Sequence, residues 1–160
     1  MKKAILASAA LAIAGIGLSG CGQEAAAPVE TAPEGFPGVT VTDGRLVLPA
    51  VKGNPAAVYF DIAYEGDRVA LIRAVSVQKS ESALMHTTVE AQGQTFMEEL
   101  LQVKLESGEP VKFERGGHHL MVEGLDETVA AGDTIEVTLT FLGGDKLSFP
   151  AEVLAAGDAR

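Results

Sequence analysis

The segment SALMHTTVEAQGQTFMEEL, residues 82–100, decides the fold class of this 160-residue chain. Residues 82–90 and 94–100 contain β-branched and aromatic side chains, which favour strands. Gln92-Gly93 between them is typical of a tight turn, because glycine readily adopts the left-handed backbone conformation that such turns need. The segment therefore predicts a β-hairpin.

The length of the predicted turn decides which residues of the hairpin face each other. With a two-residue turn at Gln92-Gly93, residue 88 pairs with residue 97 and residue 86 with residue 99. His86 and Met97 then lie diagonally on one face, within reach of long side chains. A loop one residue longer or shorter would put them on opposite faces, so the register decides whether they can meet.

Short strand-like runs bounded by Gly, Pro or Asp continue along the rest of the chain. Asp43-Gly44 has the composition of a hairpin turn, and no long stretch shows helical periodicity. We therefore predict an all-β domain, a sandwich or a small barrel. Besides the hairpin, the predicted strands are residues 39–42, 45–48, 57–64, 68–77, 111–114, 118–123, 134–142 and 147–153.

The N-terminus has the features of an export signal. Lys2 and Lys3 precede an apolar run, residues 4–18, which is too short and too rich in alanine for a membrane-spanning helix. The run ends in Leu18-Ser19-Gly20-Cys21, which resembles the lipobox of bacterial lipoproteins. This resemblance implies that Cys21 is acylated and that lipid anchors the mature chain to a membrane, in the periplasm or cell envelope.

Cys21 is the single cysteine of the chain, so the mature domain has no disulfide and depends on its core for stability. Without the lipobox, a lone cysteine could instead be a buried inert residue or a reactive thiol. The predicted organisation is a signal peptide (1–20), a flexible linker with several prolines and alanines (21–37), one domain (38–154) and a short tail (155–160).

The negative charge of the chain limits the classes of partner that it can bind. The formal net charge is −10, and it becomes −12 when residues 1–20 are removed, because Lys2 and Lys3 are lost with no acidic residue. Nucleic-acid binding needs a basic patch, so we expect no nucleic-acid partner. An anionic membrane would repel the domain, so the lipid must provide the attachment. The negative charge could favour cations or a basic partner, or only keep the protein soluble.

Alternation along the strands separates a core face from an outer face. In the first strand of the hairpin, the set that contains Met85 is the more apolar, so we expect Met85 in the core and His86 outside. In the second strand, Phe96 and Leu100 mark the expected core face and Met97 the outer face.

The predicted strand at residues 118–123 shows the same pattern. Leu120 and Val122 are expected inside, which places His119 and Met121 outside. A single exposed methionine needs no explanation. Methionines that face outward, each matched with a histidine, predict a binding site.

Two imidazoles and two thioethers form a donor set that favours copper. Thioether sulfur selects Cu(I), and imidazole suits copper as well as zinc. Calcium and magnesium prefer oxygen ligands, and structural zinc normally uses thiolates or more imidazoles. The residues alone leave a second interpretation open, in which the methionines fill gaps in the core and the histidines are incidental.

The spacing of these residues resembles the periplasmic copper chaperone family PCu(A)C. That family shows a His, ten residues, a Met, twenty-one residues, a His, one residue and a Met; this chain has His86, Met97, His119 and Met121 at that spacing. The flanking sequences are also similar, at Gly116-Gly117, Gly124-Leu125, Gly132-Asp133 and Thr138-Leu139-Thr140-Phe141.

The resemblance implies a Greek-key β-sandwich of the cupredoxin-like kind with a Cu(I) site made by these four residues. It also implies delivery of Cu(I) toward the CuA centre of cytochrome c oxidase subunit II, alongside Sco-type proteins. Some family members carry a C-terminal tail rich in His and Met; this chain ends in residues AAGDAR, so we expect no second site there. His118 stands where the family often has an apolar residue, and we expect it to be structural unless the strand slips by one residue.

Other classes of function fit less well. We expect no enzyme, because the chain has no nucleophile-elbow or zincin motif. A blue-copper electron carrier normally needs a thiolate ligand, which the mature domain lacks. The remaining alternative is an envelope lipoprotein that sequesters copper or acts as a scaffold without delivering the metal.

Overall fold

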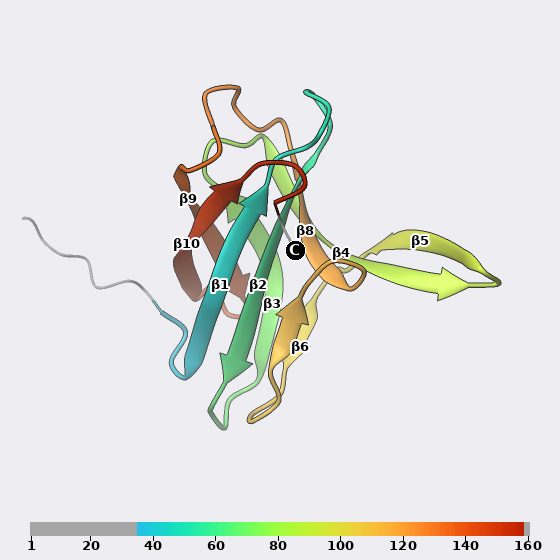
Figure 1. Cartoon of the computed structure of the whole chain (residues 1–160). Helices are drawn as coiled ribbons and strands as arrows, with labels where there is room; N and C mark the ends of the chain where they lie inside the picture. The colour runs from blue at the N-terminus through green and yellow to red at the C-terminus, as the bar shows by residue number, and fades with distance from the viewer. Residues whose placement is uncertain (1–34, 159–160) are drawn as a thin grey trace, which may run out of the picture. The chain divides into compact units, whose positions relative to one another are not determined.

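The computed structural model describes residues 35–158, so the predicted signal peptide, Cys21 and most of the predicted linker lie outside the described residues. Within this range the chain is all-β (Figure 1), as predicted, and contains no helix of the length and apolarity needed to cross a membrane. The strands are β1 (Val39–Val47), β2 (Ala56–Tyr64), β3 (Ala70–Val77), β4 (Ser82–Ala91), β5 (Gln94–Glu99), β6 (Val103–Leu105), β7 (Val111–Phe113), β8 (His118–Glu123), β9 (Thr134–Phe141) and β10 (Lys146–Leu154).

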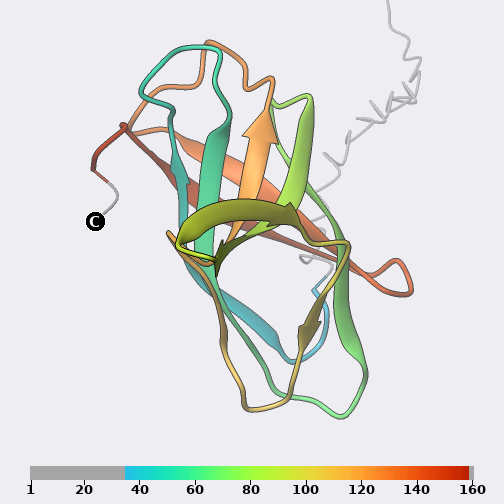
Figure 2. The same ribbon diagram turned by 90° about the vertical axis from the view of Figure 1, so that its right-hand side faces the viewer.

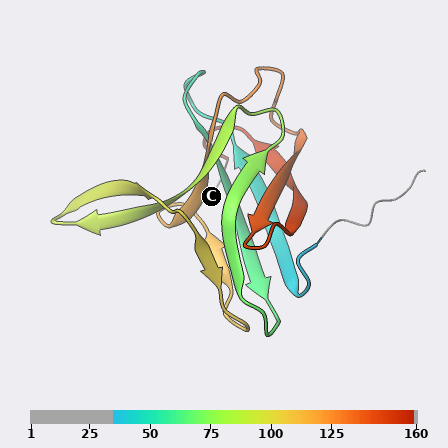
Figure 3. The same ribbon diagram turned by 180° about the vertical axis from the view of Figure 1, so that it is seen from behind.

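Hydrogen bonds join these strands in the order β5-β4-β8-β7-β2-β1-β10-β9-β3-β6, with an additional pairing of β2 with β8. The neighbours are antiparallel except for β1 with β10 and β7 with β8, which are parallel. The sheet folds over itself, so that β3 and β9 lie behind β1 and β2 (Figures 1 and 3). The hydrophobic core fills the space between these two layers, and the predicted sandwich is confirmed.

The predicted hairpin turn at Asp43-Gly44 is wrong. Residues 39–47 form one continuous strand, β1, which pairs with β2 on both sides of a register shift between Thr42 and Arg45. Asp43 has a φ of 55°, so the two residues form a bulge that keeps the strand running. A Cβ at Gly44 would lie 2.6 Å from the carbonyl oxygen of Pro150, so glycine allows the close approach of β10.

The short edge strand β6 was not predicted. It consists of three residues, Val103–Leu105, which pair with β3 at the end of the sheet. Three residues are too few to show the alternation on which strand prediction depends. The side chains of Val103 and Leu105 are buried in the core, so packing against distant strands stabilises β6.

Aromatic side chains pack together in the core on the inner face of β2 and its neighbours. Alternate residues of β2 are buried along its whole length, which gives this strand one complete core face. The ring of the fully buried Phe60 stacks on Phe113 of β7 with centroids 4.2 Å apart and lies 4.9 Å from Phe149 of β10. Burial of aromatic rings removes a large apolar area from water, so this cluster contributes strongly to the stability of the domain.

The hairpin of β4 and β5 has the predicted register. Residue 88 pairs with residue 97 and residue 86 with residue 99. Gln92 and Gly93 both have positive φ, 55° and 74°, as a two-residue type I′ turn requires.

The outer part of this hairpin projects away from the sandwich (Figures 1 and 3) and is turned toward the viewer in Figure 2; all six residues of β5 are exposed. The prediction that Phe96 lies in the core is therefore wrong, since its side chain is 47% exposed. The outer part of the hairpin lies beyond the second layer of the sandwich, so Phe96 has no core to pack against. Leu100, at the base of the hairpin, packs against the core as predicted.

We expect Phe60→Ala to lower the free energy of unfolding by about 3–5 kcal/mol, the usual cost of truncating a buried aromatic residue. Phe96→Ala is the matched control and should change it by less than about 0.5 kcal/mol, because that side chain is half exposed and lies outside the core. Urea denaturation followed by circular dichroism measures both values. A loss of similar size in the two variants would contradict this description of the core.

Candidate metal centre

His86 and His119 face each other directly across two neighbouring strands. They are register partners in the antiparallel pairing of β4 with β8, and their ring centroids lie 6.0 Å apart. Partners in an antiparallel pair point to the same side of the sheet. On the other side, their neighbours Met85 and Leu120 form the next pair and are buried in the core. The predicted outward face of both histidines is therefore confirmed.

We expected His119 on a solvent-exposed face, but its side chain is only 8% exposed. Besides His86, the ring of Tyr59 on β2 lies beside it, with centroids 6.4 Å apart. The Nδ1 atom of His119 lies 3.1 Å from the carbonyl oxygen of Gly117. A carbonyl oxygen only accepts, so Nδ1 carries the proton, and Nε2 of the neutral ring keeps a free lone pair. A bond of this kind commonly orients a metal-ligating histidine.

His86 has two buried ring nitrogens, Nδ1 and Nε2, with no hydrogen-bond partner among the described residues. Buried polar atoms are normally paired, because an unmade hydrogen bond costs free energy. A neutral imidazole has a lone pair on one of these nitrogens, and a metal ion would satisfy it. His86 therefore fits the role of a ligand better than that of a structural side chain.

The two candidate methionines lie on opposite sides of the histidine pair. Met121 of β8 is half-buried and faces Leu84 of β4, whereas Met97 faces Thr88 across the hairpin and is 62% exposed. Each is diagonal to His86 in the sheet, at opposite corners, where a long thioether side chain is within reach of the pair.

Met85 and His118 take no part in this arrangement. Met85 is 4% exposed and belongs to the core, as predicted. His118 pairs with Thr87 and has its ring 5.8 Å from that of Phe113, on the opposite face from His119. The predicted direction of His118 is thus confirmed, and the strand has not slipped by one residue.

Tyr59 is the neighbour of the site that sequence reasoning missed. Its contact with His119 depends on the pairing of β2 with β8, in which Val58 faces Leu120. The two strands are separated by more than fifty residues of chain, and no local pattern reveals which distant strand lies beside β2.

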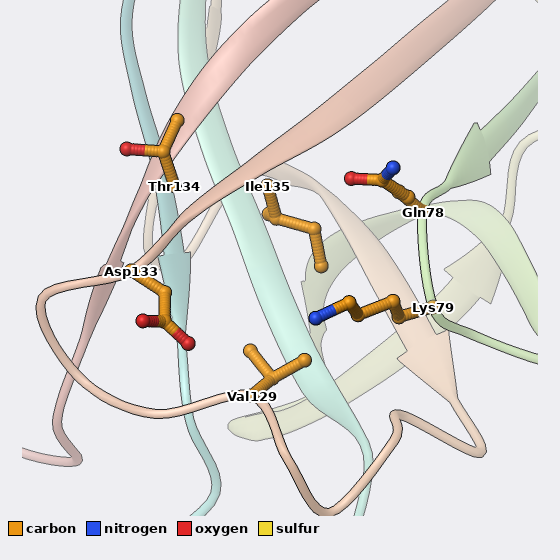
Figure 4. Close-up of a pocket in the computed structure, with 6 residues that line it drawn as sticks. All are labelled: Gln78, Lys79, Val129, Asp133, Thr134 and Ile135. Atoms are coloured by element: carbon orange, nitrogen blue, oxygen red, sulfur yellow. The ribbon is translucent and has the colours of Figure 1, made fainter.

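The described residues offer no competing metal centre. Within residues 35–158, no group of three or more His, Cys, Asp or Glu side chains is placed to hold an ion. The pocket in Figure 4 lies by the loop before β9 and contains none of the four candidate ligands; its lining residues are Gln78, Lys79, Val129, Asp133, Thr134 and Ile135. The histidine pair with its two methionines is therefore the strongest candidate.

Comparison with known proteins places the chain in a family. The sequence pattern of LpqE-like lipoproteins matches residues 39–153, which is almost the whole domain. The chain belongs to the LpqE-like lipoprotein family. A relative named as a lipoprotein, Lxx21020 of Leifsonia xyli subsp. xyli, is 28% identical over 130 residues, which cover 81% of this chain and 77% of the relative.

Solved structures similar to this LpqE-like chain include PCuAC domains. The copper-bound PCuAC domain from PmoF2 has a TM-score of 0.62 at 18% identity and covers 76% of this chain and 96% of that one. Cu(I)-bound DR1885 from Deinococcus radiodurans has a TM-score of 0.62 at 19% identity and covers 82% and 87%. The resemblance to the PCu(A)C family is confirmed at the level of the fold, which is the predicted cupredoxin-like β-sandwich.

We expect neutral His119 to carry its proton on Nδ1, because that atom donates to the carbonyl of Gly117. Nitrogen-15 NMR of the metal-free protein, at a pH at which imidazole is neutral, distinguishes the two tautomers. His118 serves as an internal comparison, since its Nδ1 has no hydrogen-bond partner among the described residues. A proton on Nε2 of His119 would contradict the assignment.

Proposed function

We propose that this protein is an extracytoplasmic copper carrier that binds Cu(I) through His86, Met97, His119 and Met121. The observation that carries the proposal is the direct pairing of His86 with His119, in which both ring nitrogens of His86 are buried and have no hydrogen-bond partner within residues 35–158. Such a pair is difficult to explain as packing, because it leaves a polar ring unsatisfied in a half-buried position.

The donor set supports Cu(I) over other ions. Two imidazoles and two thioethers provide soft and intermediate ligands and no oxygen. Outside the cytoplasm, thiolates tend to form disulfides, whereas thioethers cannot pair in that way. Methionines are therefore suitable ligands for a carrier in the cell envelope.

The fold and the family are consistent with this role. The similar solved domains include a copper-bound PCuAC domain and Cu(I)-bound DR1885. We propose that residues 1–20 are a signal peptide, that acylated Cys21 anchors the protein, and that residues 21–37 link the anchor to the domain at 38–154. A tether of this kind raises the effective concentration of the domain near membrane-bound acceptors.

The acceptor that we propose is the CuA centre of cytochrome c oxidase subunit II, with Sco-type proteins as further partners. Met97 lies on the projecting hairpin and is 62% exposed, whereas His119 is 8% exposed. An incoming acceptor would therefore displace Met97 first, while the histidines still hold the ion. Ligand exchange in this order transfers copper without releasing it to solvent.

We expect the protein to bind one equivalent of Cu(I). The double variant Met97→Leu with Met121→Leu should lose at least tenfold in Cu(I) affinity, because even residues that only hydrogen-bond to metal ligands commonly contribute 10- to 100-fold to metal affinity. An anaerobic competition titration against a chromogenic Cu(I) chelator measures this. Met85→Leu is the matched control, because it removes the same thioether from the core face and should leave the affinity unchanged. Unchanged binding in the double variant would refute the site.

A transfer assay separates delivery from storage. We expect the Cu(I)-loaded protein to pass its ion to an apo CuA domain, even with a chelator present that captures free copper. The copper content of the two proteins after chromatographic separation gives the result. Copper that stays on the donor would favour the alternative function, a lipoprotein that sequesters copper without a delivery role.

A further inference from the structure

Glu99 stands beside the proposed copper site in a row that crosses three strands. His86 of β4 is the register partner of His119 on β8 and also of Glu99 on β5. Partners across antiparallel strands point to the same side of the sheet. The three side chains therefore stand next to one another on the outer face, with His86 in the middle.

The hydrogen-bond pattern of the hairpin brings Glu99 close to His86. The amide of Leu100 donates to the carbonyl of Met85 at 2.7 Å, so these two residues form a hydrogen-bonded pair. The next pair, His86 with Glu99, is then of the non-hydrogen-bonded type, in which side chains approach most closely, with Cβ atoms roughly 4.5–5.5 Å apart. Met97 is only a diagonal neighbour of His86, at roughly 7–8 Å.

The carboxylate of Glu99 is available for binding. Its side chain is exposed, and none of the ion pairs or side-chain hydrogen bonds among the described residues involves it. The described residues contain no ready-made group of three such ligands, so the carboxylate has to turn toward the imidazoles when an ion binds. Glu98, its neighbour in sequence, pairs with Thr87 and points to the other face.

We propose that Glu99 is a further ligand, which allows the His86–His119 pair to hold Cu(II) as well as Cu(I). This inference rests on the proposed function, because it uses the same histidine pair. Two imidazoles and a carboxylate form a set of nitrogen and oxygen ligands that suits Cu(II). Sites with such ligands bind Cu(II) more strongly than the other divalent first-row metals. The two thioethers serve the softer Cu(I). The site thus presents a harder and a softer set of ligands around one pair of histidines.

The test uses Cu(II) alone as the probe and the full-length chain as the protein. Electron paramagnetic resonance reports the ligands of the bound ion, and competition titration gives its affinity. We expect Glu99→Gln to weaken Cu(II) binding at least tenfold, to change the copper hyperfine splitting, and to leave the Cu(I) affinity unchanged. Glu98→Gln is the matched control and should change neither ion, because that side chain faces away from His86.

Two results would overturn the inference while leaving the Cu(I) site intact. One is a Cu(II) affinity and spectrum that are the same in Glu99→Gln as in the unmodified protein. The other is a Cu(II) signal that survives His86→Ala, because the ion would then bind elsewhere. Failure of the proposed function gives a different result, namely an unchanged Cu(I) affinity in the double variant Met97→Leu with Met121→Leu.

Discussion

The ladder of hydrogen bonds between β4 and β8 is the constraint on which the rest of this structure depends. It pairs Met85 with Leu120 on the core face and His86 with His119 on the outer face. Burial of each large apolar side chain is worth about 1.5–3 kcal/mol, so the core pair holds the register in place. A shift of one residue would bury the histidines and expose the core. The geometry of the candidate metal centre is therefore stabilised by packing on the opposite side of the sheet.

The strands that carry the ligands of the proposed site differ in how firmly the rest of the sheet holds them. His86 and His119 belong to strands with neighbours on both sides, whereas Met97 and Glu99 belong to the edge strand β5. All residues of that strand are exposed, and the hairpin that carries it projects beyond the sandwich (Figures 1 and 3). A carrier needs both properties, because a positioned pair holds the ion and accessible ligands exchange with an acceptor.

The surroundings of the site match a role in the cell envelope. The chain belongs to a family of lipoproteins and has a strong net negative charge, −10 by formal count. That charge raises the local concentration of cations and repels an anionic membrane, so a lipid and a linker would keep the domain near the membrane without holding it flat against the surface. The proposed thioether donors, unlike thiols, cannot form disulfides outside the cytoplasm.

The sequence by itself determined the local features. These are the two-residue turn at Gln92-Gly93, the pairing of residue 88 with 97, and the inward direction of Met85, because turn chemistry and alternation act between neighbours in the chain. The tertiary structure alone decided that His86 faces His119, that Tyr59 lies beside the ring of His119, and that Asp43-Gly44 forms a bulge. It also left Phe96 in solvent, since a core face exists only where a second layer covers it. Pairing between distant strands follows from burial summed over the whole sandwich, which no short stretch of sequence contains.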